Sequence, residues 1–177
     1  MRKVTCLIIS ALLLYTGYMP YLHAQPQQAK LIPFKLKDQF DREFEERDFH
    51  HWILILNGFD KSGSQYAKAW MQAIHDALQD TEEFYKVLQV AVADLRGIPF
   101  FLKGFVRGKF PEKRSRWVLM DWKGDFAKAY SFQPKVTNIL VFDCASTLIH
   151  RTLGREVNKQ TLDAILAKIL SAMPDCE

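Results

Sequence analysis

Cysteine is scarce in this sequence of 177 residues, which contains Cys6, Cys144 and Cys176 and no others. No two of them stand in a Cys-x-x-Cys spacing. The stretch 57–65, which follows the apolar run 53–56 and leads into a helical pattern, contains none. A thiolate at such a strand–helix junction would be stabilised by the helix N-terminus. The sequence therefore lacks the nucleophile that this kind of junction is suited to activate.

Metal-ligand spacings and nucleic-acid motifs are also missing. His50 and His51 are adjacent, so their side chains would point to opposite faces of an extended segment, and no His-x-x-x-His pattern occurs. We therefore expect no metal site and no cofactor. The sequence contains no nucleic-acid-binding motif either, and we expect no nucleic-acid partner.

The longest apolar run lies at the N-terminus. Arg2 and Lys3 precede a short apolar core, and Ala24 provides a small residue for cleavage before Gln25. This pattern is typical of a secretory signal peptide. The alternative is an uncleaved membrane anchor, although the core is interrupted before the ~20 residues that span a bilayer. No comparable run follows, so we expect no stable membrane span after cleavage and a periplasmic or secreted protein.

We expect the mature chain to fold as one domain, because about 150 residues can bury a full hydrophobic core. The predicted boundaries are 1–24 for the signal peptide, 25–31 for a flexible tail and 32–177 for the domain. Apolar spacing predicts strands over 52–56, 87–93, 138–142 and 147–151, and helices over 64–78 and 158–173. Residues 117–130 are predicted to form a minor hairpin or a strand and turn. This order indicates an α/β sandwich with a mixed sheet.

Positive charge is concentrated in one stretch of the chain. Removing Arg2 and Lys3 with the signal peptide lowers the formal charge from +4 to +2. Six cations nevertheless lie close together against Glu112 alone: Lys103, Arg107, Lys109, Lys113, Arg114 and Arg116. They are interleaved with four aromatic residues: Phe101, Phe105, Phe110 and Trp117. One interpretation is a solvated face with ordinary core aromatics. The other is a surface for anionic lipid headgroups, polyanions or an acidic envelope protein.

Three segments resemble, in this order, the thioredoxin-like superfamily and in particular its redoxin or peroxiredoxin-like branch. Residues 34–40 (FKLKDQF) are similar to that branch's opening hairpin, and 124–130 (GDFAKAY) to the segment that follows its second helix. Residues 138–143 (NILVFD) resemble the strand that ends in aspartate before a hairpin turn. The resemblance covers about residues 32–170. It implies a thioredoxin-like three-layer sandwich with a mixed β-sheet and an N-terminal hairpin.

In redoxins the strand–helix junction holds the catalytic cysteine or a Cys-x-x-Cys pair, and a cis-proline begins the later strand. The resemblance places these positions at Ser62, Gln65 and Thr137, so the redox site is degenerate. We interpret Ser62 and Gln65 as a capping box, in which the Ser62 hydroxyl bonds the Gln65 amide and Gln65 reaches back. The functional alternative is a crevice at the helix N-terminus for a peptide or a small anion.

The resemblance also brings the last two cysteines together. In the resembled fold, Cys144 follows a strand that runs away from the degenerate site. The final helix descends toward that same end, where Cys176 should finish. We expect these residues to form a structural disulfide in an oxidising compartment, and two unpaired thiols are the alternative.

These observations favour an exported redoxin-like protein without thiol catalysis that serves as a binding or accessory module in the cell envelope. Whether it is an enzyme stays open, with the balance against it. One alternative is a divergent thiol–disulfide or peroxide oxidoreductase that uses Cys144 or Cys176. The other is a protein that binds membrane surfaces through residues 100–117.

Overall fold

The computed structural model describes residues 29–176, so the predicted signal peptide and the start of the predicted tail lie outside the described residues. The end of that tail is not loose. Leu31 is buried, its N–H donates to the Ser146 carbonyl at 2.8 Å, and the Leu148 N–H donates to the Ala29 carbonyl at 2.7 Å. The tail prediction is therefore wrong for residues 29–31, because the apolar Leu31 is drawn into the core.

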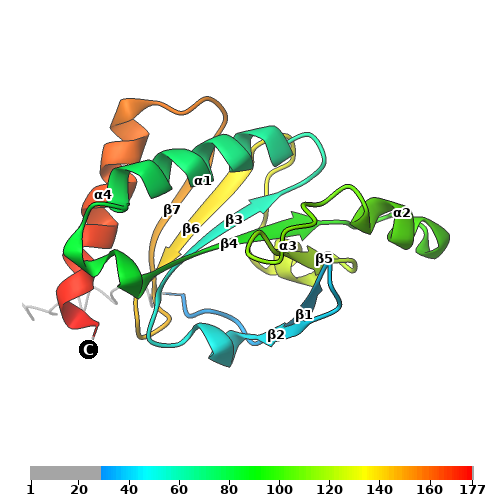
Figure 1. Cartoon of the computed structure of the whole chain (residues 1–177), viewed down its shortest axis with the longest axis horizontal. Helices are drawn as coiled ribbons and strands as arrows, with labels where there is room; N and C mark the ends of the chain where they lie inside the picture. The colour runs from blue at the N-terminus through cyan, green and yellow to red at the C-terminus, as the bar shows by residue number, and fades with distance from the viewer. Residues whose placement is uncertain (1–28, 177) are drawn as a thin grey trace, which may run out of the picture.

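The described strands form one mixed sheet in the order β2-β1-β5-β4-β3-β6-β7 (Figure 1). Their bounds are β1 (Lys35–Asp38), β2 (Glu43–Glu45), β3 (Ile53–Phe59), β4 (Val87–Asp94), β5 (Val118–Asp121), β6 (Thr137–Phe142) and β7 (Leu148–Gly154). Strands β3, β4 and β5 run parallel, whereas β6 is antiparallel to β3 and β1 is antiparallel to β5. The predicted mixed sheet and the N-terminal hairpin, formed by β1 and β2, are confirmed.

Helices and short 3₁₀ turns connect these strands. The α-helices are α1 (Ser64–Leu78), α2 (Lys103–Arg107), α3 (Asp125–Ala129) and α4 (Lys159–Ala172). The 3₁₀ turns are η1 (Glu46–Phe49), η2 (Glu82–Lys86), η3 (Phe100–Leu102) and η4 (Met173–Asp175). None of the helices within residues 29–176 is long and apolar enough to cross a membrane.

Strand β3 separates two hydrophobic layers because successive side chains of a strand point to opposite faces. Ile53 and Ile55 pack under α1 and α4, in one cluster with Trp70 and Ile165. Leu54 and Leu56 point the other way, into a cluster that includes side chains of η1 and α3. All seven residues of β3 are buried, which explains why its sequence is almost uninterruptedly apolar. The result is a helix–sheet–helix sandwich (Figure 1).

For residues 117–130 the predicted strand is confirmed, whereas the alternative of a minor hairpin is wrong. The first part is not half of a minor hairpin: β5 is an internal strand between β1 and β4. The second part is the helix α3, which begins where Asp121 accepts hydrogen bonds from the N–H groups of Asp125 at 3.1 Å and Ala127 at 2.9 Å. Satisfying the free N–H groups of a first turn favours a helix over a return strand.

Candidate functional site

The loop after β3 is held against the loop before β6 by Asp60. Its Oδ1 accepts a hydrogen bond from the Gly63 N–H at 2.7 Å, which closes the turn into α1. Its Oδ2 accepts from the Lys135 N–H at 3.1 Å, which joins segments 75 residues apart in the sequence. We refer to residues 60–65 and 133–137 together as the junction site. It corresponds to the predicted degenerate redox site.

Gly63 and Asn138 complete the contact between these two loops. A Cβ atom on Gly63 would lie 2.2 Å from the Val136 carbonyl oxygen. The two loops can approach this closely because Gly63 has no side chain. The Asn138 Nδ2 donates to the carbonyls of Gly58 at 3.2 Å and Gln133 at 3.0 Å, and its Oδ1 accepts from the Gln133 N–H at 2.7 Å. The two loops are therefore held together by hydrogen bonds from the Asp60 and Asn138 side chains to backbone groups and by the close approach of Gly63 to Val136.

The predicted capping box at Ser62 and Gln65 is wrong. Helix α1 begins at Ser64, and its N-cap is Gly63, which has no side chain with which to cap. Asp60 supplies the side-chain acceptor that was expected from Ser62. A carboxylate is a stronger acceptor than a hydroxyl, because hydrogen bonds to a charged group are stronger than hydrogen bonds to a neutral one. The sequence signal was an aspartate directly after a strand and three residues before a glycine, which is typical of a turn.

The three predicted redox-site positions lie on loops that contact each other but differ in exposure. Ser62 and Gln65 are exposed at the start of α1, whereas Thr137 is fully buried opposite Phe59 in the β3–β6 pairing. Neither the Thr137 hydroxyl nor the side-chain amide of the buried Asn57 has a hydrogen-bond partner among the described residues. A surface ligand could therefore reach Ser62 and Gln65 but not Thr137.

The side chains of the junction site are poorly suited to covalent catalysis. Asp60 accepts hydrogen bonds from backbone N–H groups through both oxygens, and Lys61 and Lys135 are exposed. A serine such as Ser62 needs an adjacent base to become a nucleophile. Within the described residues there is also no group of three His, Cys, Asp or Glu side chains placed to hold a metal ion. The exposed side chains of the site, including Ser62 and Gln65, lie at the start of α1.

A second polar group lies where β4 and β5 end, since Asp94 and Asp121 are register partners. Asp94 forms an ion pair with Arg96, whose Nε donates to Oδ1 at 3.0 Å. Burial raises the pKa of Asp121, and the N–H groups at the start of α3 oppose that rise. These partners indicate that both carboxylates hold turns in place, and sequence reasoning missed the role of Asp121.

The predicted basic segment projects from the molecule around α2 (Figure 1). We call residues 98–116 the basic–aromatic projection. Its aromatic rings are largely outside the core, with Phe100 83%, Phe101 71% and Phe105 66% exposed. The interpretation of Phe101 and Phe105 as core aromatics is therefore wrong, because the five-residue α2 is too short to bury a full stripe. Phe110 and Trp117 are partly buried, as that interpretation expected.

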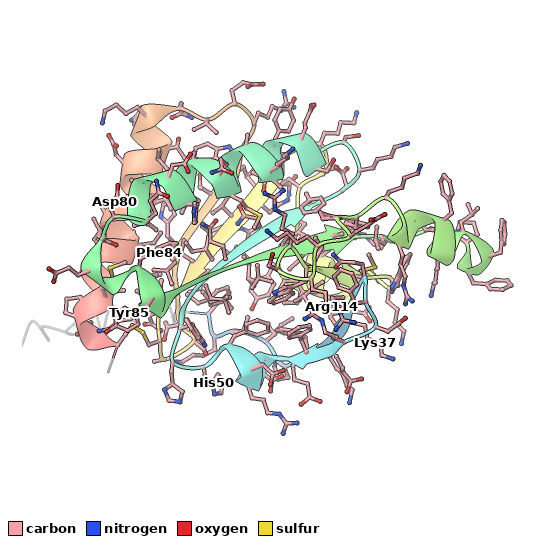
Figure 2. All side chains as sticks on the ribbon, viewed as in Figure 1. Lys37, His50, Asp80, Phe84, Tyr85 and Arg114 are labelled. Carbon is pink, nitrogen blue, oxygen red and sulfur yellow. A yellow bond between two sulfur atoms is a disulfide. The ribbon has the colours of Figure 1, made fainter. Side chains whose placement is uncertain are left out.

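The six predicted cations spread over this projection and the loop behind it. Arg107 forms an ion pair with Asp41 at 2.6 Å, while Lys103 lies 5.0 Å from the Trp122 ring and Lys109 lies 4.6 Å from the Phe105 ring. Lys113, Arg114 and Arg116 are exposed. Figure 2 shows Arg114 and Lys37 at the same end of the molecule as α2. Positive charge and exposed aromatic rings therefore share one end of the sheet.

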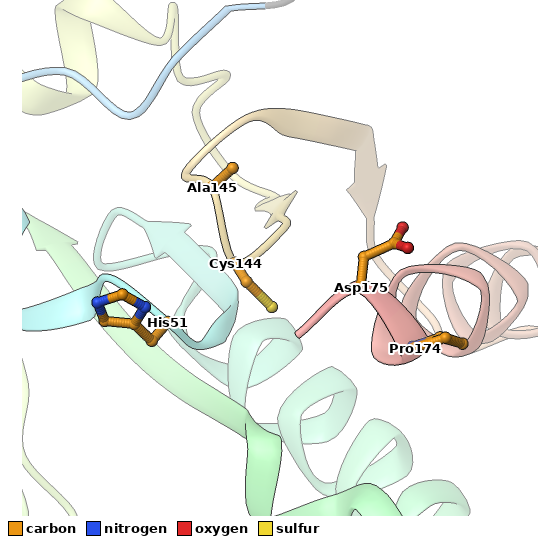
Figure 3. Close-up of a pocket in the computed structure, with 5 residues that line it drawn as sticks. All are labelled: His51, Cys144, Ala145, Pro174 and Asp175. Carbon is orange, nitrogen blue, oxygen red and sulfur yellow. The ribbon is translucent and has the colours of Figure 1, made fainter. Parts of the chain in front are cut away.

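Cys144 and Cys176 are joined by a disulfide, with their Cα atoms 5.6 Å apart. The register of β6 on β3 pairs Phe142 with Leu54, so the bond lies at the end of the sheet opposite the junction site. Cys176 is 3% exposed. Beside the bond is a shallow depression lined by His51, Cys144, Ala145, Pro174 and Asp175 (Figure 3).

Comparison with solved structures assigns this architecture to the thioredoxin-like fold. The exposed lipoprotein thioredoxin Etrx1 of Streptococcus pneumoniae matches with a TM-score of 0.57 and 15% identity, over 79% of this chain and 99% of the other. A putative thiol:disulfide interchange protein DsbE of Chlorobium tepidum matches at 0.59 and 17%, over 82% and 96%. A SCO1/SenC family lipoprotein of Bacillus anthracis matches at 0.58 and 18%, over 84% and 98%. No protein-family model and no curated protein matches the sequence.

Proposed function

We propose that this protein is exported and acts as a non-catalytic thioredoxin-fold module that binds a partner in the cell envelope. The observation that carries the proposal is the distribution of sulfur. The resemblance assigns the cysteine positions of thiol enzymes to Ser62 and Gln65, and the cysteines of the described chain are bonded to each other at the opposite end of the sheet. A disulfide between residues 32 positions apart also favours an oxidising compartment.

The solved structures of similar fold support export and are compatible with an accessory role. Two are described as lipoproteins, and another belongs to a family of cytochrome c oxidase assembly proteins. The rigid junction site, closed by Asp60 and Gly63, fits such a role because it offers a fixed surface rather than a reactive group.

Insulin reduction and peroxide consumption, measured on the exported protein with and without dithiothreitol, test the absence of thiol catalysis. We expect rates equal to those without protein. A wild-type turnover that disappears in Cys144→Ser or Cys176→Ser would establish the alternative, a divergent oxidoreductase using these cysteines. Mild crosslinking in the cell envelope, followed by mass spectrometry, tests the binding role: a partner recovered with wild type should be lost when the surface that contacts it is substituted.

A further inference from the structure

The basic–aromatic projection is built to keep apolar rings in contact with solvent. Ile98, Val106 and Phe110 are partly buried against the cluster that contains Phe59 and Ala67. Their packing attaches the projection to the sheet. Phe100, Phe101 and Phe105 point elsewhere and stay between 66% and 83% exposed. Exposed rings on an anchored support are costly for a protein surrounded by water alone, and such patches mark interaction sites.

Polar contacts hold the same support in one position. Arg107 of α2 pairs with Asp41 in the β1–β2 turn at 2.6 Å. Gln39 in that turn donates to the Pro111 carbonyl at 3.1 Å and the Arg116 carbonyl at 3.0 Å, and accepts from the Val118 N–H at 2.8 Å. These contacts attach the middle and the C-terminal end of the projection to the hairpin. The ring orientation is a property of the fold rather than of a loose loop.

The cations around the rings carry no balancing acids in the described structure. Among the described residues, Lys103, Lys109 and Lys113 form no ion pair, and the same is true of Arg114 and Arg116. Lys109 Nζ lies over the Phe105 ring, so charge and apolar surface are adjacent. Adjacent aromatic rings and free cations are the composition that binds the interface of an anionic bilayer.

We propose that the projection docks the protein onto a membrane surface of anionic phospholipid, with Phe100, Phe101 and Phe105 entering the headgroup–acyl boundary. Lys103 and Lys109 then contact lipid phosphates. The bilayer is favoured over an acidic protein because the rings stand on a protruding turn and helix rather than in a groove. A fluid bilayer accepts protruding rings without preformed pockets, whereas a protein partner would need a cavity for each. The inference deepens the proposed binding role, and rests on it.

Sedimentation with lipid vesicles tests this docking. The exported wild-type protein is mixed with vesicles of phosphatidylcholine alone and of phosphatidylcholine with phosphatidylglycerol, at low and high salt. We expect binding to the anionic vesicles, and weaker binding at high salt because the cations are screened. The triple variant Phe100→Ser, Phe101→Ser, Phe105→Ser and the double variant Lys103→Gln, Lys109→Gln should each bind at least about tenfold more weakly.

Matched variants control for the loss of any exposed apolar or basic side chain. Tyr85, Leu153 and Leu170 are also exposed large hydrophobics, and Lys68 and Lys168 are exposed lysines on α1 and α4. Their replacement by Ser and Gln respectively should leave vesicle binding unchanged. Because all variants share one N-terminus, differences between them report on the projection. Unchanged circular dichroism and thermal midpoints exclude unfolding as the cause.

Three outcomes overturn the docking. These are no binding of wild type to anionic vesicles, equal binding of the projection variants and the control variants, and binding to soluble polyglutamate with none to vesicles, which would indicate an acidic protein partner. None of them depends on thiol chemistry. Turnover in the insulin assay would remove the non-catalytic role while leaving the vesicle result readable, so the two proposals fail separately.

Discussion

Thiol enzymes of this fold combine a helix N-terminus and a cysteine at one end of the sheet. In the described part of this chain, the helix N-terminus and the cysteines lie at opposite ends. At the carboxyl end of β3, the junction site keeps the strand, the turn and the N-terminus of α1, but Ser62 and Gln65 stand at its surface. At the opposite end, Cys144 and Cys176 are bonded to each other. Among residues 29–176, the helix terminus that could stabilise a thiolate has no thiol, and the two cysteine sulfur atoms lie at the opposite end of the sheet. The comparison teaches that contacts between the loops can hold the strand, turn and helix of the junction together without a cysteine in residues 57–65.

The largest expected effect comes from breaking the disulfide end. Replacing both Cys144 and Cys176 by Ser should lower the free energy of unfolding by about 3–4 kcal/mol, because the bond closes a loop of 32 residues. The thermal midpoint should then fall by about 10 °C. Calorimetry measures it, and wild type under strong reductant should match the double variant. A midpoint that reductant leaves unchanged would show that the bond contributes nothing to stability.

The stability of the junction site is expected to depend on the close approach of Gly63 to the backbone of Val136. Gly63→Ala places a Cβ 2.2 Å from the Val136 carbonyl oxygen, which must move, and should cost about 1–3 kcal/mol. Gly104 in α2 is the matched control, because a Cβ there meets nothing within 4 Å. Gly104→Ala should be neutral or stabilising by up to about 1 kcal/mol. Urea unfolding of the two variants distinguishes them, and equal midpoints would mean that the loops are not tightly packed.

Substitution of Asp60 should have a smaller effect on stability, and substitution of Ser62 a smaller effect still. Asp60→Ala removes the carboxylate that accepts from the N–H groups of Gly63 and Lys135 and should cost about 1–2 kcal/mol, although Gly63 keeps the Asp60 carbonyl as an acceptor at 3.1 Å. Ser62→Ala should change stability by less than about 0.5 kcal/mol, because the side chain is exposed and Asp60 accepts from the Gly63 N–H. Thermal melts of both variants check this order. The reverse order would restore Ser62 as the capping residue.

The smallest effect concerns pH and His150 in β7. Burial, followed by the charge of Lys168, lowers the pKa of this imidazole below its model-compound value of 6.5. Between the folded pKa and 6.5 the unfolded chain binds a proton that the folded chain does not, so stability is lost as the pH falls through this window. His150→Gln should flatten that part of the profile of thermal midpoint against pH. His50→Gln, at an exposed position, is the control, and a profile unchanged by His150→Gln would refute the assignment.

Much of the fold could be predicted, because the spacing of apolar residues along the sequence reflects which faces of a strand or helix are buried. The apolar run of β3 and the stripe of α1, which includes Trp70 and Ile74, predicted both elements. The bounds of α1 agree to the residue, whereas β3 extends three residues beyond the predicted strand 52–56. The resemblance of three short segments then predicted the arrangement that the solved structures share. The hairpin of β6 and β7 was also predicted, since two apolar runs flank a short polar turn.

The details of the sites depended on long-range contacts that a local pattern does not contain. Asp60 is a turn residue in the sequence, and its second bond, to Lys135, exists because β6 lies beside β3. Asp121 ends a strand, and its part in starting α3 follows from burial of its carboxylate. Phe101 and Phe105 were interpreted as core aromatics, whereas the segment that carries them is attached to the sheet through Val106 and leaves both rings exposed to solvent.

The state of the two cysteines tests the account most directly. Protein isolated from the exported fraction without reductant is alkylated, digested and analysed by mass spectrometry. The account predicts no alkylated cysteine and a cross-linked peptide pair containing Cys144 and Cys176. Two alkylated thiols, or either cysteine in a mixed disulfide with another protein, would contradict it, because the sulfur would then be free for exchange.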